Sequence, residues 1–511
     1  MQFTRFTKTP FYFNKRCNFR RSLGLRLPTP TIIPRCSGRV SILSMELLAV
    51  GLNTFGQLGI GQRVRKDFYV PTKFGAQEPS SGTSLSNDSA SVNGLNTDEI
   101  EDVQCGCHAT VVLFKDGRVQ MTGSVMNYVL PVLQSVPISF PSKAVQVACG
   151  RKHVLLLFDS GCVMSWGTGY FGQLGHGDDS SVEEPTLIKA LTPAALGSRV
   201  VRVSAGGNHS GVITDSGEAF MWGLNRSGQC GTSMKADVLL VPKPVDMKKA
   251  VTQNGGQAIR IKQLVCGRNH SGCVSTEGRV YTWGAATMGR TGLNLSTAVK
   301  VQMCPAELPI FNAHPVKQLA TGDFHMIALC TDGGVYSWGY SSDGQTGHAT
   351  LIHCRTPKRM EFFDLVDKIE QVDCGAGFSM ARDINGYLYG WGYGDGGWMG
   401  LKPPREEDMP VFDCDEAVDY PVIRGHVHIR SFDSTHTVIL PAKISMLKNR
   451  VVRLIRCGGA HTILFVSSRP TTVFDSKEDD NNEVQLNMML DSDSDSDTGI
   501  HTGVNSAIAK K

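Results

Sequence analysis

The chain has 511 residues, of which 41% are hydrophobic and 19% are charged, and its net charge is +4. This composition is typical of a globular protein with a large core, and it excludes a chain that is disordered over most of its length. No segment approaches the roughly 18 consecutive apolar residues that a membrane-spanning helix needs, so we expect no membrane span.

Charge is distributed unevenly along the chain. Residues 1–45 contain nine Arg or Lys residues and no acidic residue, whereas residues 468–511 contain nine acidic and four basic residues. The part between them therefore has no net charge, and it lacks the basic surface typical of a nucleic-acid-binding domain. We expect contact with nucleic acid or chromatin only if residues 1–45 provide it.

The basic segment 1–45 has three interpretations. It resembles a mitochondrial transit peptide, because it lacks acids and is rich in Phe, Ser and Thr. It also fits a basic chromatin-binding tail, and translation could instead start at Met45, directly before the first predicted strand. The first interpretation predicts a mitochondrial protein and the others a cytoplasmic or nuclear one. The 15 scattered cysteines favour an intracellular, reducing compartment over a secreted disulfide framework.

A repeat begins directly after this segment. Trp-Gly pairs recur at separations of 53 to 61 residues, which is in the range of propeller blades. In each copy the Gly of Trp-Gly is followed five residues later by a second Gly and three residues after that by a third. A further copy at residues 51–59 has Val50 in place of the Trp. The six copies are Gly51, Gly56 and Gly59; Gly167, Gly172 and Gly175; Gly223, Gly228 and Gly231; Gly284, Gly289 and Gly292; Gly339, Gly344 and Gly347; and Gly392, Gly397 and Gly400.

A second motif, Cys-Gly-x-x-His or a variant of it, precedes each Trp-Gly pair and is followed by an apolar run and an X-Gly pair. Such X-Gly pairs are typical of tight hairpin turns, because Gly accepts the positive φ that these turns require. Each repeat is therefore expected to form a strand, a tight turn, a second strand, a Gly-rich turn and a longer loop. The seven copies of this core motif end on His108, His153, His209, His270, His325, Phe378 and His461.

The two ends of the repeat region complement each other. Residues 48–59 supply only the second half of a repeat, and residues 455–466 supply only the first half. Pairing of these halves would close a ring and leave no open sheet edge. We therefore predict an all-β fold, a seven-bladed β-propeller over residues 46–467 that is closed by N- and C-terminal strands. The flanking residues 1–45 and 468–511 are expected to be flexible basic and acidic tails.

Three segments interrupt or follow the repeat. Residues 431–440 include His436 and resemble an eighth core motif without a Trp-Gly pair. We interpret them as a strand within the 401–454 connection, with a shortened eighth blade as the alternative. The Ser-, Asn- and Gly-rich residues 78–98 are interpreted as an inserted loop. The acidic residues 475–497 are either a substrate of an acid-directed kinase or a solubilising tail.

The motifs Cys-Gly-x-x-His, Asp-Gly, Trp-Gly and Gly-Gln-Leu-Gly, the last at residues 56–59 and 172–175, resemble the regulator of chromosome condensation (RCC) repeat family. The resemblance covers about residues 46–467 and implies a seven-bladed propeller closed by strands from both ends of the chain. Family members include exchange factors for the small GTPase Ran, ubiquitin-ligase modules, a plant light receptor and mitochondrial proteins. Membership therefore implies a fold far more narrowly than a function.

Residues that recur once in every blade are expected to be structural. We interpret the core histidines as hydrogen-bonded interior groups, the Trp residues as packing groups and the core cysteines as small buried hydrophobes. Cys105, Cys107 and His108 lie close together in sequence, but they lack a matching second pair, so we predict no metal site. No catalytic or phosphate-binding motif occurs at a usable spacing, and we therefore predict neither a cofactor nor an enzyme activity.

Function in a propeller is expected where the repeat is broken. The residues directly before the core histidines differ from blade to blade, and the turns that carry them are expected on one face. We predict that this face binds a partner protein through Arg151, Lys152, Asn208, Arg268, Asn269, Asp323, Phe324 and His325.

The resemblance to the Ran exchange factors implies roles for three of these positions. In that branch the third core motif has an acidic residue directly before its His, where this chain has Asn208. The second core motif there has an acidic residue two places before its His, where this chain has Arg151. Only His325 matches the branch, in the fifth motif. The two missing carboxylates argue against nucleotide release by the same mechanism.

We expect a non-enzymatic module that binds and regulates a protein partner. One hypothesis is an exchange-factor-like regulator of a small GTPase. The alternatives are an adaptor or scaffold without exchange activity and a chromatin-associated RCC-like protein. The neutral charge of residues 46–467 argues against the last of these.

Overall fold

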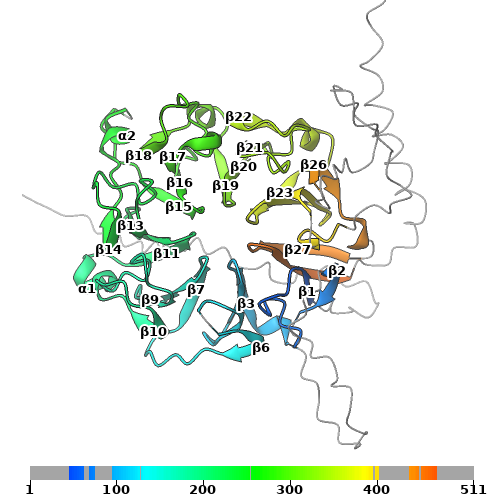
Figure 1. The fold of residues 1–511 in the computed structure, drawn as a ribbon, viewed down its shortest axis with the longest axis horizontal. Helices are drawn as coiled ribbons and strands as arrows, with labels where there is room; N and C mark the ends of the chain where they lie inside the picture. Colours follow the sequence, from blue (N-terminus) through cyan, green and yellow to red (C-terminus); the bar gives the residue numbers. More distant parts are fainter. Residues whose placement is uncertain are drawn as a thin grey trace, which may run out of the picture. The chain divides into compact units, whose positions relative to one another are not determined.

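The computed structural model describes residues 45–61, 68–74, 95–126, 128–253, 255–394, 397–401, 437–447 and 450–468. In this part of the chain the strands form seven antiparallel four-stranded sheets, as predicted. The innermost strands of successive sheets contact one another in a closed circle, from β3 through β7, β11, β15, β19, β23 and β27 back to β3. Figure 1 shows these sheets as the blades of a propeller.

Blades 1 to 6 each consist of four consecutive strands. Blade 1 contains β3 (Ile100–Cys105), β4 (Ala109–Phe114), β5 (Val119–Gly123) and β6 (Leu130–Ser135). Blade 2 contains β7 (Ala144–Cys149), β8 (His153–Phe158), β9 (Val163–Gly167) and β10 (Val182–Leu187). Blade 3 contains β11 (Val200–Ala205), β12 (His209–Thr214), β13 (Ala219–Leu224) and β14 (Val238–Pro244).

The following three blades repeat this arrangement. Blade 4 contains β15 (Ile261–Cys266), β16 (His270–Ser275), β17 (Val280–Ala285) and β18 (Val301–Glu307). Blade 5 contains β19 (Val316–Thr321), β20 (His325–Cys330), β21 (Val335–Gly339) and β22 (Cys354–Arg359). Blade 6 contains β23 (Ile369–Cys374), β24 (Phe378–Asp383), β25 (Leu388–Tyr393) and β26 (Thr437–Lys443). Two short helices, α1 (Pro193–Leu196) and α2 (Lys248–Gln253), lie in the connections after β10 and β14.

Blade 7 combines the two ends of the described chain. Its strand order is β2 (Phe68–Lys73), β1 (Met45–Gly51), β28 (His461–Ser468) and β27 (Arg450–Cys457). The register pairs Met45 with Ser467 and Gly51 with His461. In Figure 1 the blue strands β1 and β2 lie in the same blade as the orange strand β27. The predicted closure by N- and C-terminal strands is thereby confirmed.

Strand β26 decides the interpretation of the 401–454 connection. It pairs with β25 as the outermost strand of blade 6, so it completes that blade rather than starting another. His436 itself lies outside the described residues, as do residues 1–44, residues 78–94 of the predicted insertion 78–98 and the acidic segment 475–497. Within the described part of the chain, no helix is long and apolar enough to cross a membrane.

The recurring glycines stand where the chain approaches itself closely. Gly167 has φ 111°, and a Cβ atom there would lie 2.5 Å from the backbone oxygen of Lys152. Gly175 has φ 78°, and a Cβ atom there would lie 2.7 Å from Nε1 of Trp222 in the next blade. Trp222 is fully buried, and its indole N–H donates to the backbone oxygen of Gln173 at 2.9 Å. The glycine spacing therefore reflects steric exclusion within and between blades.

Five of the six core histidines connect adjacent blades, whereas His108 is half-buried and its Nε2 lies 3.4 Å from Sγ of the neighbouring Cys107. Nε2 of His209 lies 2.8 Å from Oγ of Ser271 in the next blade, and that hydroxyl donates to the backbone oxygen of Gln229 at 2.8 Å. Ser271 therefore accepts a hydrogen bond from the Nε2–H of His209. Burial lowers the pKa of His209 to about 3, which keeps the ring neutral at physiological pH. The equivalent pairs are His153 with Ser210, His270 with Thr321, His325 with Ser379, and His461 with Thr110.

Candidate functional site

The loops between the first and second strands of the blades form one continuous rim, which we call the entrance-loop ring. It comprises residues 106–108, 150–152, 206–208, 267–269, 322–324, 375–377 and 458–460. Backbone hydrogen bonds join six of the seven pairs of neighbouring loops, for example from the Arg151 N–H to the Gly206 oxygen at 3.1 Å and from the Asp323 N–H to the Ala376 oxygen at 3.0 Å. The loops at residues 267–269 and 322–324 are joined instead by the side-chain ion pair of Arg268 and Asp323. A Cβ atom on Gly206 would lie 2.4 Å from the backbone oxygen of Gly267, so glycine is required for this approach. The ring is thus a pre-organised platform for the variable side chains.

Three of the predicted site residues form a compact cluster on this platform. Nη1 of Arg268 lies 3.5 Å from Oδ2 of Asp323, and both side chains are more than one-third exposed. The guanidinium carbon of Arg268 lies 5.3 Å from the centre of the Phe324 ring. Arg290, a residue that the sequence pattern did not single out, lies over the same ring at 4.7 Å. Two cations therefore contact one aromatic ring, and a carboxylate lies beside them.

Arg151 belongs to the same electrostatic environment. Partial burial raises the pKa of Asp323, while the positive charges of Arg268, Arg151 and Arg290 oppose that rise. Burial and Asp323 raise the pKa of the Cys107 thiol, and Arg151 and Arg268 act in the opposite direction. The charges of blades 2, 4 and 5 therefore act together near the middle of the ring.

The other predicted residues are placed differently. Lys152 is exposed, and together with Arg151 it adds to the burial that lowers the pKa of His108 to about 4. Asn208 and Asn269 are half-buried, and their backbone oxygens accept hydrogen bonds from the N–H groups that follow the Trp-Gly pairs of their own blades. His325 is fully buried and hydrogen-bonded to Ser379, so its side chain offers no surface for a partner in this structure.

A cavity of about 480 Å³ opens beside the cluster, where blades 4, 5 and 6 meet. Asp323 and Phe324 form part of its lining. The rest of the lining includes Arg290, Tyr340, Asp343, Tyr393 and Trp398.

The cavity residues occupy positions where the repeat pattern changes. In four copies of the Gly-rich turn the second Gly is followed by Gln, as in Gln173, whose side-chain oxygen accepts a hydrogen bond from the Phe171 N–H at 2.9 Å. Arg290 and Trp398 stand at this position in blades 4 and 6. Neither side chain has an acceptor atom that could make the same bond within its own loop. Their departure from Gln was the signal in the sequence that could have revealed this cavity.

Tyrosines provide the second departure. The residue after Trp-Gly is Tyr in blades 5 and 6, as Tyr340 and Tyr393, whereas blades 2, 3 and 4 have Thr168, Leu224 and Ala285 there. The Tyr340 ring lies 5.8 Å from the Phe324 ring, and the Tyr393 ring lies 4.7 Å from that of Trp398. The cavity therefore has aromatic groups on the parts that belong to blades 5 and 6.

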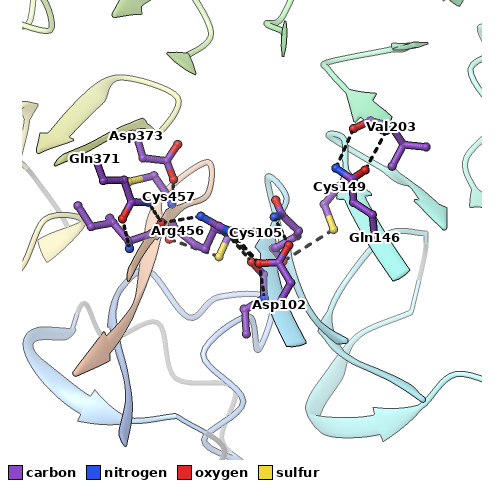
Figure 2. A network of polar contacts seen from close by, with 12 residues as sticks. Asp102, Cys105, Gln146, Cys149, Val203, Gln371, Asp373, Arg456 and Cys457 are labelled. Atoms are coloured by element: carbon purple, nitrogen blue, oxygen red, sulfur yellow. Dashed lines mark hydrogen bonds and ion pairs between the residues drawn. The ribbon is translucent and has the colours of Figure 1, made fainter. Parts of the chain in front are cut away.

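A separate polar network joins the inner strands where the ring closes (Figure 2). Nη2 of Arg456 lies 2.8 Å from Oδ1 of Asp102, which joins blades 7 and 1. Asp373 in blade 6 accepts hydrogen bonds from the Cys457 and Cys374 N–H groups, both at 2.9 Å. Burial raises the pKa of Asp373 to about 6, although the nearby positive charge of Arg456 opposes this. These contacts stabilise the closure and are distinct from the exposed cluster.

The cysteines and acidic residues give no metal site in the described residues. No group of three or more His, Cys, Asp or Glu side chains there could hold an ion. The core cysteines contribute to packing instead, and burial raises the pKa of Cys266 to about 12.

The comparisons with known proteins agree with this architecture. The family model for the RCC1-like domain matches residues 46–381. The chain belongs to the RCC1-like domain family. Its propeller is similar to the crystal structure of Prp20p from Saccharomyces cerevisiae, with a TM-score of 0.63 and 19% identity over 88% of this chain and 96% of that one. This structural likeness shows the fold alone.

Two relatives indicate the range of proteins that contain this domain. The ultraviolet-B receptor UVR8 of Arabidopsis thaliana is 32% identical over 268 residues, which are 52% of this chain and 57% of the receptor. The secretion-regulating guanine nucleotide exchange factor of Bos taurus is 28% identical over 365 residues, which are 66% of this chain and 71% of that protein. The chain thus spans little more than half the length of the plant receptor. Membership in the RCC1-like domain family leaves the binding partner to be inferred from the site.

Proposed function

We propose that this RCC1-like domain binds a protein partner through the entrance-loop ring and thereby regulates that partner. The cluster of Arg268, Asp323 and Phe324 carries the proposal, because it combines a partly exposed ion pair with an aromatic ring on a pre-organised platform. Arg and aromatic residues are enriched where protein interfaces bind most tightly. The regular residues of the ring hold the blades together, whereas these side chains vary from blade to blade.

Reversal of one charge in the cluster tests the proposal. Arg268→Glu removes one of the two cations from Phe324 and places a carboxylate beside Asp323. Arg260→Glu is the matched control, because Arg260 is exposed and directly precedes β15, whereas Arg268 follows the other end of that strand. Proteins that co-purify with the full chain from cells should be measured quantitatively for both variants and the wild type.

We expect a defined partner to be retained by the wild type and by Arg260→Glu and to be reduced at least about tenfold by Arg268→Glu, the loss typical of a charged interface residue. If every partner is retained equally by Arg268→Glu, the proposed face is not the binding face. Circular dichroism spectra of both variants establish that the fold is unchanged.

Guanine nucleotide exchange on a small GTPase is the second candidate function. One relative that aligns with 66% of the chain is named as an exchange factor, which favours this possibility. Prp20p, the yeast protein with the similar propeller, has binding properties to Gsp1p and histones. Arg151 and Asn208 stand where the Ran exchange factors have acids, so release by that mechanism is not expected.

Nucleotide release distinguishes exchange from binding alone. Fluorescent GDP release from a panel of small GTPases should be measured with the full chain in excess. Faster release from one member would support exchange, whereas no acceleration from any member would leave an adaptor that binds its partner without exchange.

A further inference from the structure

The cavity beside the entrance-loop ring is lined by two chemically different groups of residues. In the first group, Arg290 lies over Phe324 with Asp323 and Arg268 nearby, so opposite charges already face each other there. Arg290 is 7% exposed, and one of its Nη atoms donates to Oγ1 of Thr287 at 3.1 Å. The single carboxylate of Asp323 compensates only part of the positive charge of Arg268 and Arg290, and the buried Nε of Arg290 has no hydrogen-bond partner among the described residues.

Asp343 belongs to the second group of lining residues. Its Oδ2 accepts a hydrogen bond from the side-chain amide of Gln345 at 3.0 Å, and Gln345 is held in place because its Oε1 accepts from the Asp343 N–H. Burial raises the pKa of Asp343, and among the described residues only the neutral amide of Gln345 opposes that rise. A half-buried carboxylate that forms no ion pair within the described part of the chain is complementary to a cationic ligand.

Aromatic rings provide the remaining complementarity. Tyr340, Tyr393 and Trp398 line the same cavity as Asp343. Trp398 is held in place because its ring lies 4.7 Å from that of Tyr393 and 6.0 Å from that of Phe378. Faces of Tyr and Trp rings attract cations and also pack against the apolar stem of a long basic side chain.

We propose that this cavity takes the basic side chain of a partner protein, an arginine or a lysine, with Asp343 as its carboxylate and with Tyr340, Tyr393 and Trp398 packed around it. The inference rests on the proposed function, since it names the group of the partner that the face recognises. A cavity of about 480 Å³ has room for one such side chain together with water. The neighbouring Arg268 then remains available to contact other groups of the partner.

Small model compounds test the cavity without any partner. The probes are 1-butylguanidinium, 1-butylammonium, butyrate and 1-butanol, which have similar chain lengths but different charges. Met288 lines the cavity and is 45% exposed, so its methyl group is a local reporter. The full chain is labelled with methyl-¹³C methionine, and Met288→Leu identifies the signal of that residue.

We expect the two cationic probes to shift the Met288 methyl signal saturably, while butyrate and 1-butanol do not. Asp343→Asn should weaken the binding of the cations at least about tenfold, because a charge-assisted contact is lost. Asp215→Asn is the matched control, since Asp215 is an exposed carboxylate in the tight hairpin turn of blade 3, away from the cavity. Tyr340→Leu provides a second variant, with an expected weakening of about fivefold.

The competing outcomes are distinct. Binding of butyrate in preference to the cations would overturn the proposal and assign the cavity to an acidic group at Arg290. Unchanged cation binding in both Asp343→Asn and Tyr340→Leu would also overturn it. A loss of partner binding in Arg268→Glu with no cation binding to the cavity would leave the proposed function intact and remove only this inference.

Discussion

The hydrogen bond between His209 and Ser271 offers a quantitative test of how the blades are joined. Both side chains are fully buried, and the Ser271 hydroxyl accepts from the His209 Nε2–H while it donates to the Gln229 oxygen. In Ser271→Ala the Gln229 oxygen keeps the indole N–H of Trp283 as a donor at 2.9 Å. The Nε2–H of His209 is left without a partner. A shift of the proton to Nδ1 gives no relief, because that buried atom has no partner in the structure either.

The expected loss of stability in Ser271→Ala comes from the His209 N–H, which loses its acceptor, and not from the Gln229 oxygen, which keeps a donor. A buried donor without an acceptor costs about 1–3 kcal/mol, so we expect Ser271→Ala to lower the free energy of unfolding by about 2 kcal/mol. The junction of blades 6 and 7 has the hydroxyl group without the histidine, because Phe378 of blade 6 stands at the histidine position and Thr462 of blade 7 at the hydroxyl position. Thr462 still donates to the Trp398 oxygen at 2.9 Å without any histidine. His209→Phe should therefore cost less than Ser271→Ala, since no polar group is left without a partner.

Urea unfolding of the full chain, followed by far-ultraviolet circular dichroism, measures both values. The control is Ser342→Ala, because Ser342 is exposed. The reasoning would be refuted if Ser271→Ala unfolded at the wild-type urea concentration, or if His209→Phe were clearly the more damaging substitution.

Two further predictions concern ring closure and glycine spacing. Burial raises the pKa of Asp373 to about 6 in the folded protein, so its contribution to stability is greatest at low pH and is lost as the pH rises through about 6. Arg456→Met removes the cation that opposes the rise in the pKa of Asp373. The substitution should therefore lower the melting temperature more at pH 7.5, where the Asp373 carboxylate is charged, than at pH 5. Equal losses at both pH values would contradict a role of Arg456 in stabilising charged Asp373. Gly231→Ala places a Cβ atom 2.6 Å from Nε1 of Trp283 at φ 65°, and it should destabilise by more than about 2 kcal/mol in thermal unfolding. Gly197 also has a positive φ, but a Cβ atom there would meet no atom within 4 Å. Gly197→Ala should therefore lower the free energy of unfolding by only about 1 kcal/mol. Similar losses of stability in the two variants would show that contact between blades is not what requires glycine at position 231.

The fold could be predicted from the sequence because its turns require particular residues. Gly167 and Gly175 are fixed by contacts that exclude a Cβ atom, so their spacing reports the strand ends directly. The half repeats at the two ends predicted the closure that β1 and β28 make. The partner of β25 was harder to predict, because β26 begins beyond a long connection.

The candidate site was only partly predictable. Arg268, Asp323 and Phe324 were found because they precede core histidines, and the structure brings them together. Arg290 and Trp398 were missed, because the repeat was recognised by its glycines alone. The residue after the second Gly was not compared between blades, although it is Gln in four copies and Arg or Trp in these two. Contacts across the closure, such as that of Arg456 with Asp102, join residues more than 350 positions apart and leave no local sequence signal.

A footprint of the bound partner on the full chain tests the central claim most directly. Hydrogen–deuterium exchange should be compared between the free chain and its complex with the co-purified partner. We expect protection in residues 267–269 and 322–324 of the entrance-loop ring, and no change in the tight turns around Gly161 and Gly217 that follow the second strands of blades 2 and 3. Protection of those turns with an unprotected entrance-loop ring would show that the partner binds elsewhere and would contradict the account.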